Sequence, residues 1–180
     1  MNDNGKSPYS NGRHTFVVHV EDKPGVLNRV ASLFRRRGFN IESLTVGHSE
    51  EPGVSRMTIV MRGDDAIAKR VVANLYRLVN VVRVEDVTYD PSVLRDLALI
   101  KVQADSTVRT EVLQLCDVFR ARAVDVGPDA VIVEITGTED KIEGLLDVLR
   151  PFGIIEIART GRIAMTRGFF PEPARSGISP

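Results

Sequence analysis

Hydrophobic and polar positions in the first half of the chain switch between a strand-like and a helix-like period. Residues 15–20 form a β-branched and aromatic run that is typical of a strand. The next apolar positions recur every three or four residues, which predicts a helix. Its expected buried stripe is Val26, Leu27, Val30, Leu33 and Phe34. Gly38 then stands where a left-handed residue commonly ends a helix.

Three more strands and a second helix complete this first unit. Residues 41–46 form one predicted strand, and residues 56–61 alternate with period two in the next. Asp64 and Asp65 open a helix, and residues 81–87 close the unit as a strand. The helix has a core stripe of Ile67, Val71, Leu75 and Leu78. The resulting order is βαββαβ, the ferredoxin-like arrangement.

The second half of the chain repeats this order after a boundary at residues 90–92. Strands are predicted at residues 97–102, 123–126, 131–135 and 154–163. One helix carries Val108, Val112, Leu115, Cys116 and Phe119. The other begins at a Thr138 cap and carries Ile142, Leu145, Leu146 and Leu149.

The predicted fold class is therefore α+β, with two tandem ferredoxin-like βαββαβ domains at residues 14–90 and 91–167. Residues 1–13 and 168–180 are predicted to be a disordered tail and a flexible tail. Such a unit places both helices on one face of its sheet and leaves the other face and the outer strands unpartnered. Several strands are aliphatic on both faces, which predicts a homodimer or another partner.

Composition and charge reduce the number of function classes that fit the chain. Lys plus Arg and Asp plus Glu are both 24, so the chain lacks the basic excess of nucleic-acid binding proteins. The basic run at residues 35–37 fits a solvated helix end, with partner contact as the second interpretation. Cys116 is the single cysteine and is expected to pack as a small hydrophobe. The polar start and the lack of a long apolar run indicate no membrane segment and a cytoplasmic location.

Catalytic and metal-binding patterns do not emerge from the sequence. His14, His19 and His48 lack the spacing of metal ligands, and the acidic pair at residues 64–65 falls in a first helical turn. No phosphate-binding glycine loop is present. The chain is therefore expected to hold no catalytic residues, no metal and no cofactor of its own, unless distant residues assemble a site in space.

The turn at residues 22–27 is the segment whose residues suit ligand binding. A helix N-terminus offers unpaired N–H groups that suit a carboxylate, and Pro24 would preset the first helical φ. Gly25 would allow a ligand close to the main chain, and Asp22 could accept from an ammonium group. An α-amino acid matches this pairing, but an ordinary tight turn explains the same residues. Asn40 adds a polar group that could reach the turn within one chain or across a dimer.

Residues 37–46, with the sequence Arg-Gly-Phe-Asn-Ile-Glu-Ser-Leu-Thr-Val, together with residues 55–59 resemble the acetolactate synthase small-subunit family. Residues 22–27 resemble the ligand turn of ACT domains, to which the N-terminal half of that family belongs. Residues 97–102 and 157–161 are similar to its C-terminal domain.

The resemblance implies a non-catalytic regulatory subunit of branched-chain amino-acid biosynthesis. It implies a homodimer that binds the catalytic large subunit, raises its activity and confers feedback inhibition by valine, or by leucine or isoleucine. Thiamine diphosphate, magnesium and FAD are then expected in the large subunit and not in this chain. A free-standing ACT sensor that regulates another enzyme is the alternative.

By the same resemblance, the effector lies at the ACT dimer interface. Main-chain groups of Gly25, Val26 and Leu27 would hold its carboxylate. Asn40 and Ile41 of the partner subunit would meet its ammonium group and close the pocket. Asp22 stands where many family members carry Asn, and its charge suits an ammonium group but repels a carboxylate.

Overall fold

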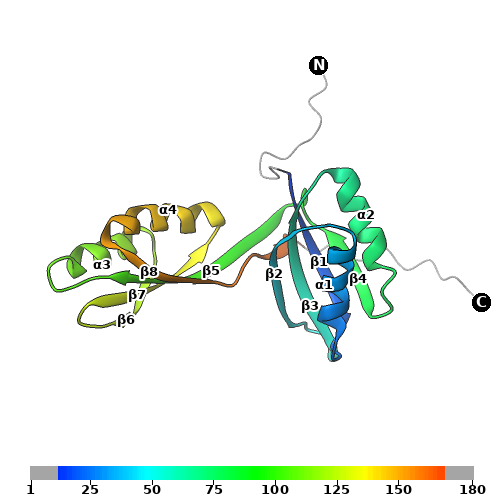
Figure 1. The fold of residues 1–180 in the computed structure, drawn as a ribbon, viewed down its shortest axis with the longest axis horizontal. Coiled ribbons are helices and arrows are strands. Elements are labelled where there is room, and N and C mark those ends of the chain that lie inside the picture. The colour runs from blue at the N-terminus through cyan, green and yellow to red at the C-terminus, as the bar shows by residue number, and fades with distance from the viewer. Residues whose placement is uncertain (1–11, 169–180) are drawn as a thin grey trace, which may run out of the picture.

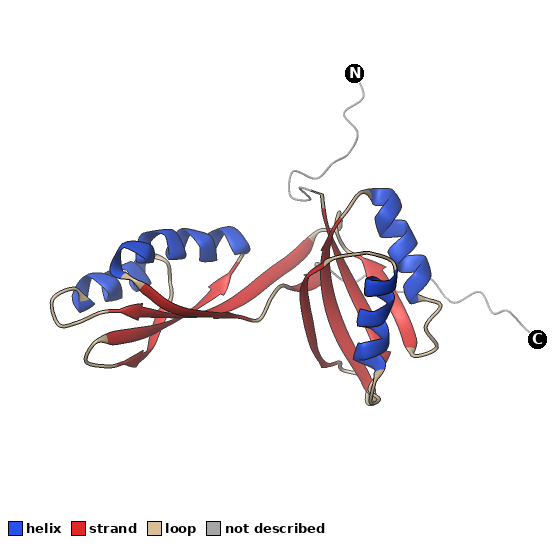
Figure 2. Ribbon diagram, viewed as in Figure 1, coloured by secondary structure: helices blue, strands red, loops and turns tan. Residues whose placement is uncertain are grey.

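The computed structural model describes residues 12–168, which form two α+β lobes (Figure 1). The predicted tails lie outside the described residues, apart from residues 12, 13 and 168. In each lobe, both helices cover one face of an antiparallel sheet (Figure 2). The predicted α+β class is confirmed.

The N-terminal lobe follows the predicted βαββαβ order. Its elements are β1 (Arg13–Glu21), α1 (Val26–Arg36), β2 (Ile41–His48), β3 (Val54–Arg62), α2 (Asp65–Leu75) and β4 (Val81–Asp86). The strands lie in the order β2-β3-β1-β4, so β2 and β4 are the edges of the sheet. Phe16 and Val18 of β1 pack against Val30 and Phe34 of α1 in one apolar core.

The C-terminal lobe repeats the arrangement and adds one strand. Its elements are β5 (Ser92–Gln103), α3 (Arg109–Val118), β6 (Arg122–Val126), β7 (Ala130–Gly137), α4 (Glu139–Leu149), the 3-10 helix η1 (Arg150–Phe152), β8 (Ile154–Arg159) and β9 (Ile163–Thr166). The main sheet has the order β6-β7-β5-β8. Cys116 is buried in its core, as expected.

Four local predictions about the helices can be compared with the structure. Asp64 caps α2 by accepting from the Ile67 N–H at 2.7 Å, and Gly38 follows α1 with a left-handed φ of 69°. Thr138 occupies the N-cap position of α4, but its side chain makes no capping hydrogen bond. Leu27 was placed in the buried stripe of α1, yet it is 45% exposed because it lies at the rim of the helix's buried face.

The prediction of one strand over residues 154–163 is wrong. The chain leaves the second sheet after β8, and β9 pairs with the first four residues of β5. The break depends on Gly161, whose φ is 88°. The Asp96 carboxylate accepts from the Gly161 N–H and from the Thr160 hydroxyl, both at 3.0 Å. These contacts come from residues distant in sequence, so the apolar pattern does not reveal the break.

The ribbon formed by β9 and the start of β5 covers part of the second face of the N-terminal sheet. Val17 and Val87 are buried there against Ala164 and Leu94. Arg56 of β3 donates to the Ala164 carbonyl at 2.5 Å. The cover that the aliphatic strands require is therefore supplied in part by the chain itself.

Gly161 permits a close approach of the two lobes that a side chain would block. A Cβ there would lie 2.3 Å from the Ser43 hydroxyl oxygen, which accepts from the Arg162 N–H at 3.1 Å and so is not free to rotate. We expect Gly161→Ala to lower the free energy of unfolding by about 2–3 kcal/mol, from backbone strain and the clash together. Urea denaturation measures the change.

Gly53→Ala is the matched control for this substitution. Gly53 also has a left-handed φ, of 77°, but a Cβ there would meet nothing within 4 Å. We expect it to lose about 1 kcal/mol, the strain alone. An equal loss in the two variants would contradict a tight contact between Gly161 and β2.

Candidate functional site

The turn between β1 and α1 leaves a helix N-terminus open. The helix begins at Val26 with Gly25 as its N-cap, and Gly25 has a left-handed φ of 83°. Pro24 precedes the cap, so the prediction that it occupies the first helical position is wrong. No side chain caps α1, and the first N–H groups of a helix have no intrahelical acceptor. A Cβ on Gly25 would meet nothing within 4 Å, so a ligand can approach the main chain there.

The three main-chain donors expected at this turn are not equivalent. The Val26 N–H already donates to the Lys23 carbonyl at 3.3 Å, and the Val26 side chain is buried. Gly25 and Leu27 are exposed. The open main-chain surface is therefore that of Gly25 and Leu27, with Val26 anchoring the turn to the core.

Asp22 has a neighbour that the sequence did not indicate. Its carboxylate lies 3.3 Å from Nδ1 of His48, the last residue of β2, and its main-chain N–H donates to the Gly53 carbonyl at 2.8 Å. Both side chains are exposed. The end of β2 thus lies beside the turn, although the two are far apart in sequence.

Asn40 and Ile41 lie at the opposite end of the same sheet. Ile41 pairs with Met61 of β3, whereas Glu21, which leads into the turn, pairs with Val54. These positions are seven residues apart along β3, or about 23 Å at about 3.3 Å per residue. One chain therefore does not bring Asn40 to the turn.

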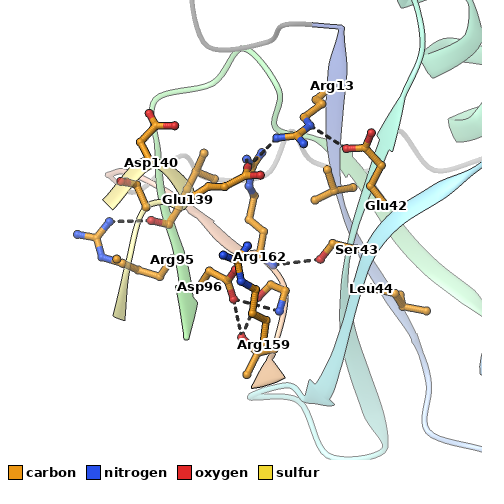
Figure 3. Close-up of a pocket in the computed structure, with 16 residues that line it drawn as sticks. Arg13, Glu42, Ser43, Leu44, Arg95, Asp96, Glu139, Asp140, Arg159 and Arg162 are labelled. Carbon is orange, nitrogen blue, oxygen red and sulfur yellow. Dashed lines mark hydrogen bonds and ion pairs between the residues drawn. The ribbon is translucent and has the colours of Figure 1, made fainter. Parts of the chain in front are cut away.

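A second concave region lies between the lobes (Figure 3). This cavity, of about 860 Å³, is lined by side chains of both signs from β1, β2, β5, the start of α4 and the segment after β8. Arg13 bridges two carboxylates there, with Nε 2.7 Å from Glu42 and Nη1 2.6 Å from Glu139. Burial alone would lower the pKa of Arg13, but Glu139 and Glu42 outweigh it and raise the pKa. The region is thus an ion-pair network around a cavity.

Comparison with known proteins identifies the family. Residues 16–83 match the family described as the AHAS small subunit-like ACT domain, and residues 95–168 match the small subunit of acetolactate synthase. The chain belongs to the acetolactate synthase small-subunit family. The resemblance drawn from residues 37–46 is thereby confirmed, and the N-terminal lobe of this family member is an ACT domain.

Individual members of the acetolactate synthase small-subunit family agree over nearly the whole chain. A probable acetolactate synthase small subunit from Archaeoglobus fulgidus is 53% identical over 156 residues, which are 87% of this chain and 98% of that protein. The acetolactate synthase small subunit from Mycolicibacterium smegmatis is 50% identical over 161 residues, 88% of this chain and 95% of that one. The crystal structure of the Thermotoga maritima small subunit superposes with a TM-score of 0.82 at 42% identity, covering 88% and 99% of the two chains.

The described residues can also be compared with the patterns of metal sites and membrane-spanning helices. Within residues 12–168, no three or more His, Cys, Asp or Glu side chains are grouped so that they could hold a metal ion. No helix in that range is long and apolar enough to span a bilayer.

Sequence reasoning missed a buried histidine on the second face of the ACT sheet. His19 is 4% exposed, its Nε2 lies 3.2 Å from Nη2 of Arg83, and its Nδ1 has no hydrogen-bond partner. Burial lowers the pKa of His19, and the nearby charges of Arg83 and Arg56 lower it further. The ring is therefore harder to protonate in the folded protein than in the unfolded chain.

This histidine should make the stability of the protein depend on pH. Because the folded pKa lies below the ordinary value of 6.5, the unfolded chain takes up a proton first as the pH falls. The free energy of unfolding should therefore decrease as the pH falls through the ordinary histidine pKa towards the lower pKa of the folded state. Urea titrations of His19→Gln should show a shallower decrease.

His48→Gln provides the control, since the His48 side chain is 87% exposed. It should leave the pH dependence of unfolding close to that of the unsubstituted protein. A His19→Gln protein with the full pH dependence would contradict a lowered pKa of this buried histidine.

Proposed function

We propose that this chain is a non-catalytic regulatory subunit that binds the catalytic large subunit of acetolactate synthase, raises its activity and makes it sensitive to valine. The observation that carries the proposal is the uncapped helix N-terminus at Gly25 in an ACT domain of the acetolactate synthase small-subunit family. The reaction itself, with thiamine diphosphate, magnesium and FAD, is assigned to the large subunit. The complex is expected in the cytoplasm.

A homodimer through β2 would complete the effector site. This strand is an edge of the ACT sheet, so the described chain pairs it on one side only. If two β2 strands pair antiparallel, the Ile41 end of one lies beside the His48 end of the other. His48 contacts Asp22 next to the turn. Such a dimer joins the two halves of the site that a single chain keeps about 23 Å apart.

The chemistry of this combined site suits a branched-chain amino acid. The N–H groups of Gly25 and Leu27 are the donors for the carboxylate, at the positive end of the α1 dipole. Asn40 and the Asp22 carboxylate are acceptors for the ammonium group. The half-exposed Leu27 and the partly buried Ile41 offer aliphatic surface to the side chain. Valine is the proposed effector, and leucine and isoleucine fit the same description.

Inhibition requires that valine bind one state of the complex more tightly than another. Coupling energies between two such sites are typically about 1–3 kcal/mol, or roughly 5- to 150-fold in affinity. Regulation of this size needs no catalytic group in the small subunit.

Reconstitution tests the proposal directly. Acetolactate formation by the large subunit of the same organism is measured with and without this chain across a valine titration. We expect the chain to raise the rate and to make it fall with valine. Activation without valine sensitivity would contradict the effector assignment, and no association at all would favour a free-standing ACT sensor.

Gly25→Asp tests the carboxylate position. The substitution places a negative charge where the valine carboxylate is proposed to bind, so half-inhibition should need at least about tenfold more valine, equivalent to about 1.4 kcal/mol. Gly25→Ala carries the same left-handed strain without the charge and should weaken inhibition less. Both variants should still activate the large subunit. Unchanged inhibition in Gly25→Asp would contradict the site.

A further inference from the structure

The two lobes face each other across ionic contacts at the cavity. Two segments connect the lobes, strand β5, which runs through both, and residues 160–162 between β8 and β9. Beside them, the start of α4 reaches the ACT domain through Glu139, which pairs with Arg13 at 2.6 Å. A cavity of about 860 Å³ lies between the lobes beside the close contact of Gly161 with Ser43, and side-chain ion pairs join the lobes across it.

Glu42 connects this junction to the proposed effector residues. The register of β2 against β3 shifts between Ile41 and Ser43, so Glu42 lies in an irregular, bulge-like position directly after Asn40 and Ile41. Bulges redirect side chains and are common beside functional sites. The Glu42 carboxylate binds Nε of Arg13 at 2.7 Å and Nε of Arg62 at 3.1 Å. A shift of Ile41 that alters the bulge would move this carboxylate.

Arg13 and Arg162 carry the connection from the ACT domain to the C-terminal lobe. Both guanidinium groups bind the same oxygen of Glu139, at 2.6 Å and 3.3 Å. Arg162 also donates from Nη1 to the Thr15 hydroxyl at 3.2 Å and from its main-chain N–H to the Ser43 hydroxyl at 3.1 Å. The contacts therefore close a ring from β2 through β1 and α4 to residue 162 and back to β2, as Figure 3 shows in part.

We propose that the ion-pair chain Glu42–Arg13–Glu139 transmits effector occupancy from the β2 bulge to the C-terminal lobe. The inference rests on the proposed function. It extends that proposal from the position of the effector to the way in which effector binding changes the C-terminal lobe. Arg13 is shared between two carboxylates, one on each lobe, so a displacement of Glu42 changes how firmly Arg13 holds Glu139. The lobes then differ in spacing between the effector-bound and effector-free states, and the effector shifts the balance because it binds one of them more tightly.

Arg13→Gln in the reconstituted complex tests this role. Valine affinity is measured by calorimetry on the small subunit, and inhibition is measured on its complex with the large subunit. We expect the variant to bind valine with an affinity within about threefold of the original, while half-inhibition needs at least about tenfold more valine, within the usual range of coupling energies. Glu139→Gln breaks the Arg13–Glu139 bridge from the other lobe, together with the Arg162–Glu139 pair, and should weaken inhibition at least as much.

Arg62→Gln is the matched control. Arg62 binds the same carboxylate of Glu42, but its side chain is 64% exposed and the bridge from Glu42 to Glu139 runs through Arg13 instead. This variant should retain inhibition. The double variant Arg13→Gln, Glu139→Gln should lose less than the sum of the two single losses, because both single variants remove the Arg13–Glu139 bridge. Additive losses, or an equal loss in Arg62→Gln, would overturn the inference.

The outcomes separate this inference from the proposed function. If the unsubstituted subunit binds no valine and confers no inhibition, the effector proposal fails, and the inference fails with it. If the unsubstituted subunit binds valine and confers inhibition, and Arg13→Gln does both equally well, only the inference is overturned.

Discussion

One strand, β5, belongs to both lobes, and the arrangement of the molecule depends on it. Its first four residues pair with β9 over the second face of the ACT sheet, and its remaining residues pair with β7 and β8 in the C-terminal sheet. A backbone ladder keeps its register because a slip of one residue would turn every side chain to the wrong face. Arg56 also holds β9 at the Ala164 carbonyl. The lobes are thus joined by continuous β-structure, and their remaining freedom lies at the cavity beside it.

The order of helices and strands could be predicted because the apolar residues of each core face recur at a regular spacing along the sequence. Phe16 and Val18 alternate in β1, and Val30 and Phe34 recur at helical spacing in α1. The break between β8 and β9 could not be predicted. The chain turns at Gly161, where it contacts Asp96 and Ser43, and both are distant in sequence. The exposure of Leu27 likewise follows from its place at the rim of the buried face of α1, which the helical period does not separate from the centre of that face. Periodicity finds elements but does not show which distant residues meet.

Part of the candidate site could likewise be predicted from the sequence and part could not. The turn at residues 22–27 could be recognised, since a glycine before a helix is a local signal, although the left-handed φ of Gly25 explains that glycine better than ligand access alone. The separation of Asn40 from the turn follows from strand register, which the sequence does not state. Arg13 fell in a predicted tail because no periodic pattern includes it. Its two carboxylate partners come from different lobes.

The chain has 24 basic and 24 acidic residues, and the structure shows where some of these opposite charges meet. Some of them are arranged as matched charges across the junction, where Arg13 and Arg162 face Glu42 and Glu139. Partly buried ion pairs contribute little net stability, because desolvation offsets much of the attraction, but their geometry is demanding. An apolar interface would fix the lobes in one packed arrangement. In the proposed coupling, shared ion pairs beside a cavity let a small displacement in β2 change how firmly Arg13 holds Glu139, which a packed apolar interface would not allow.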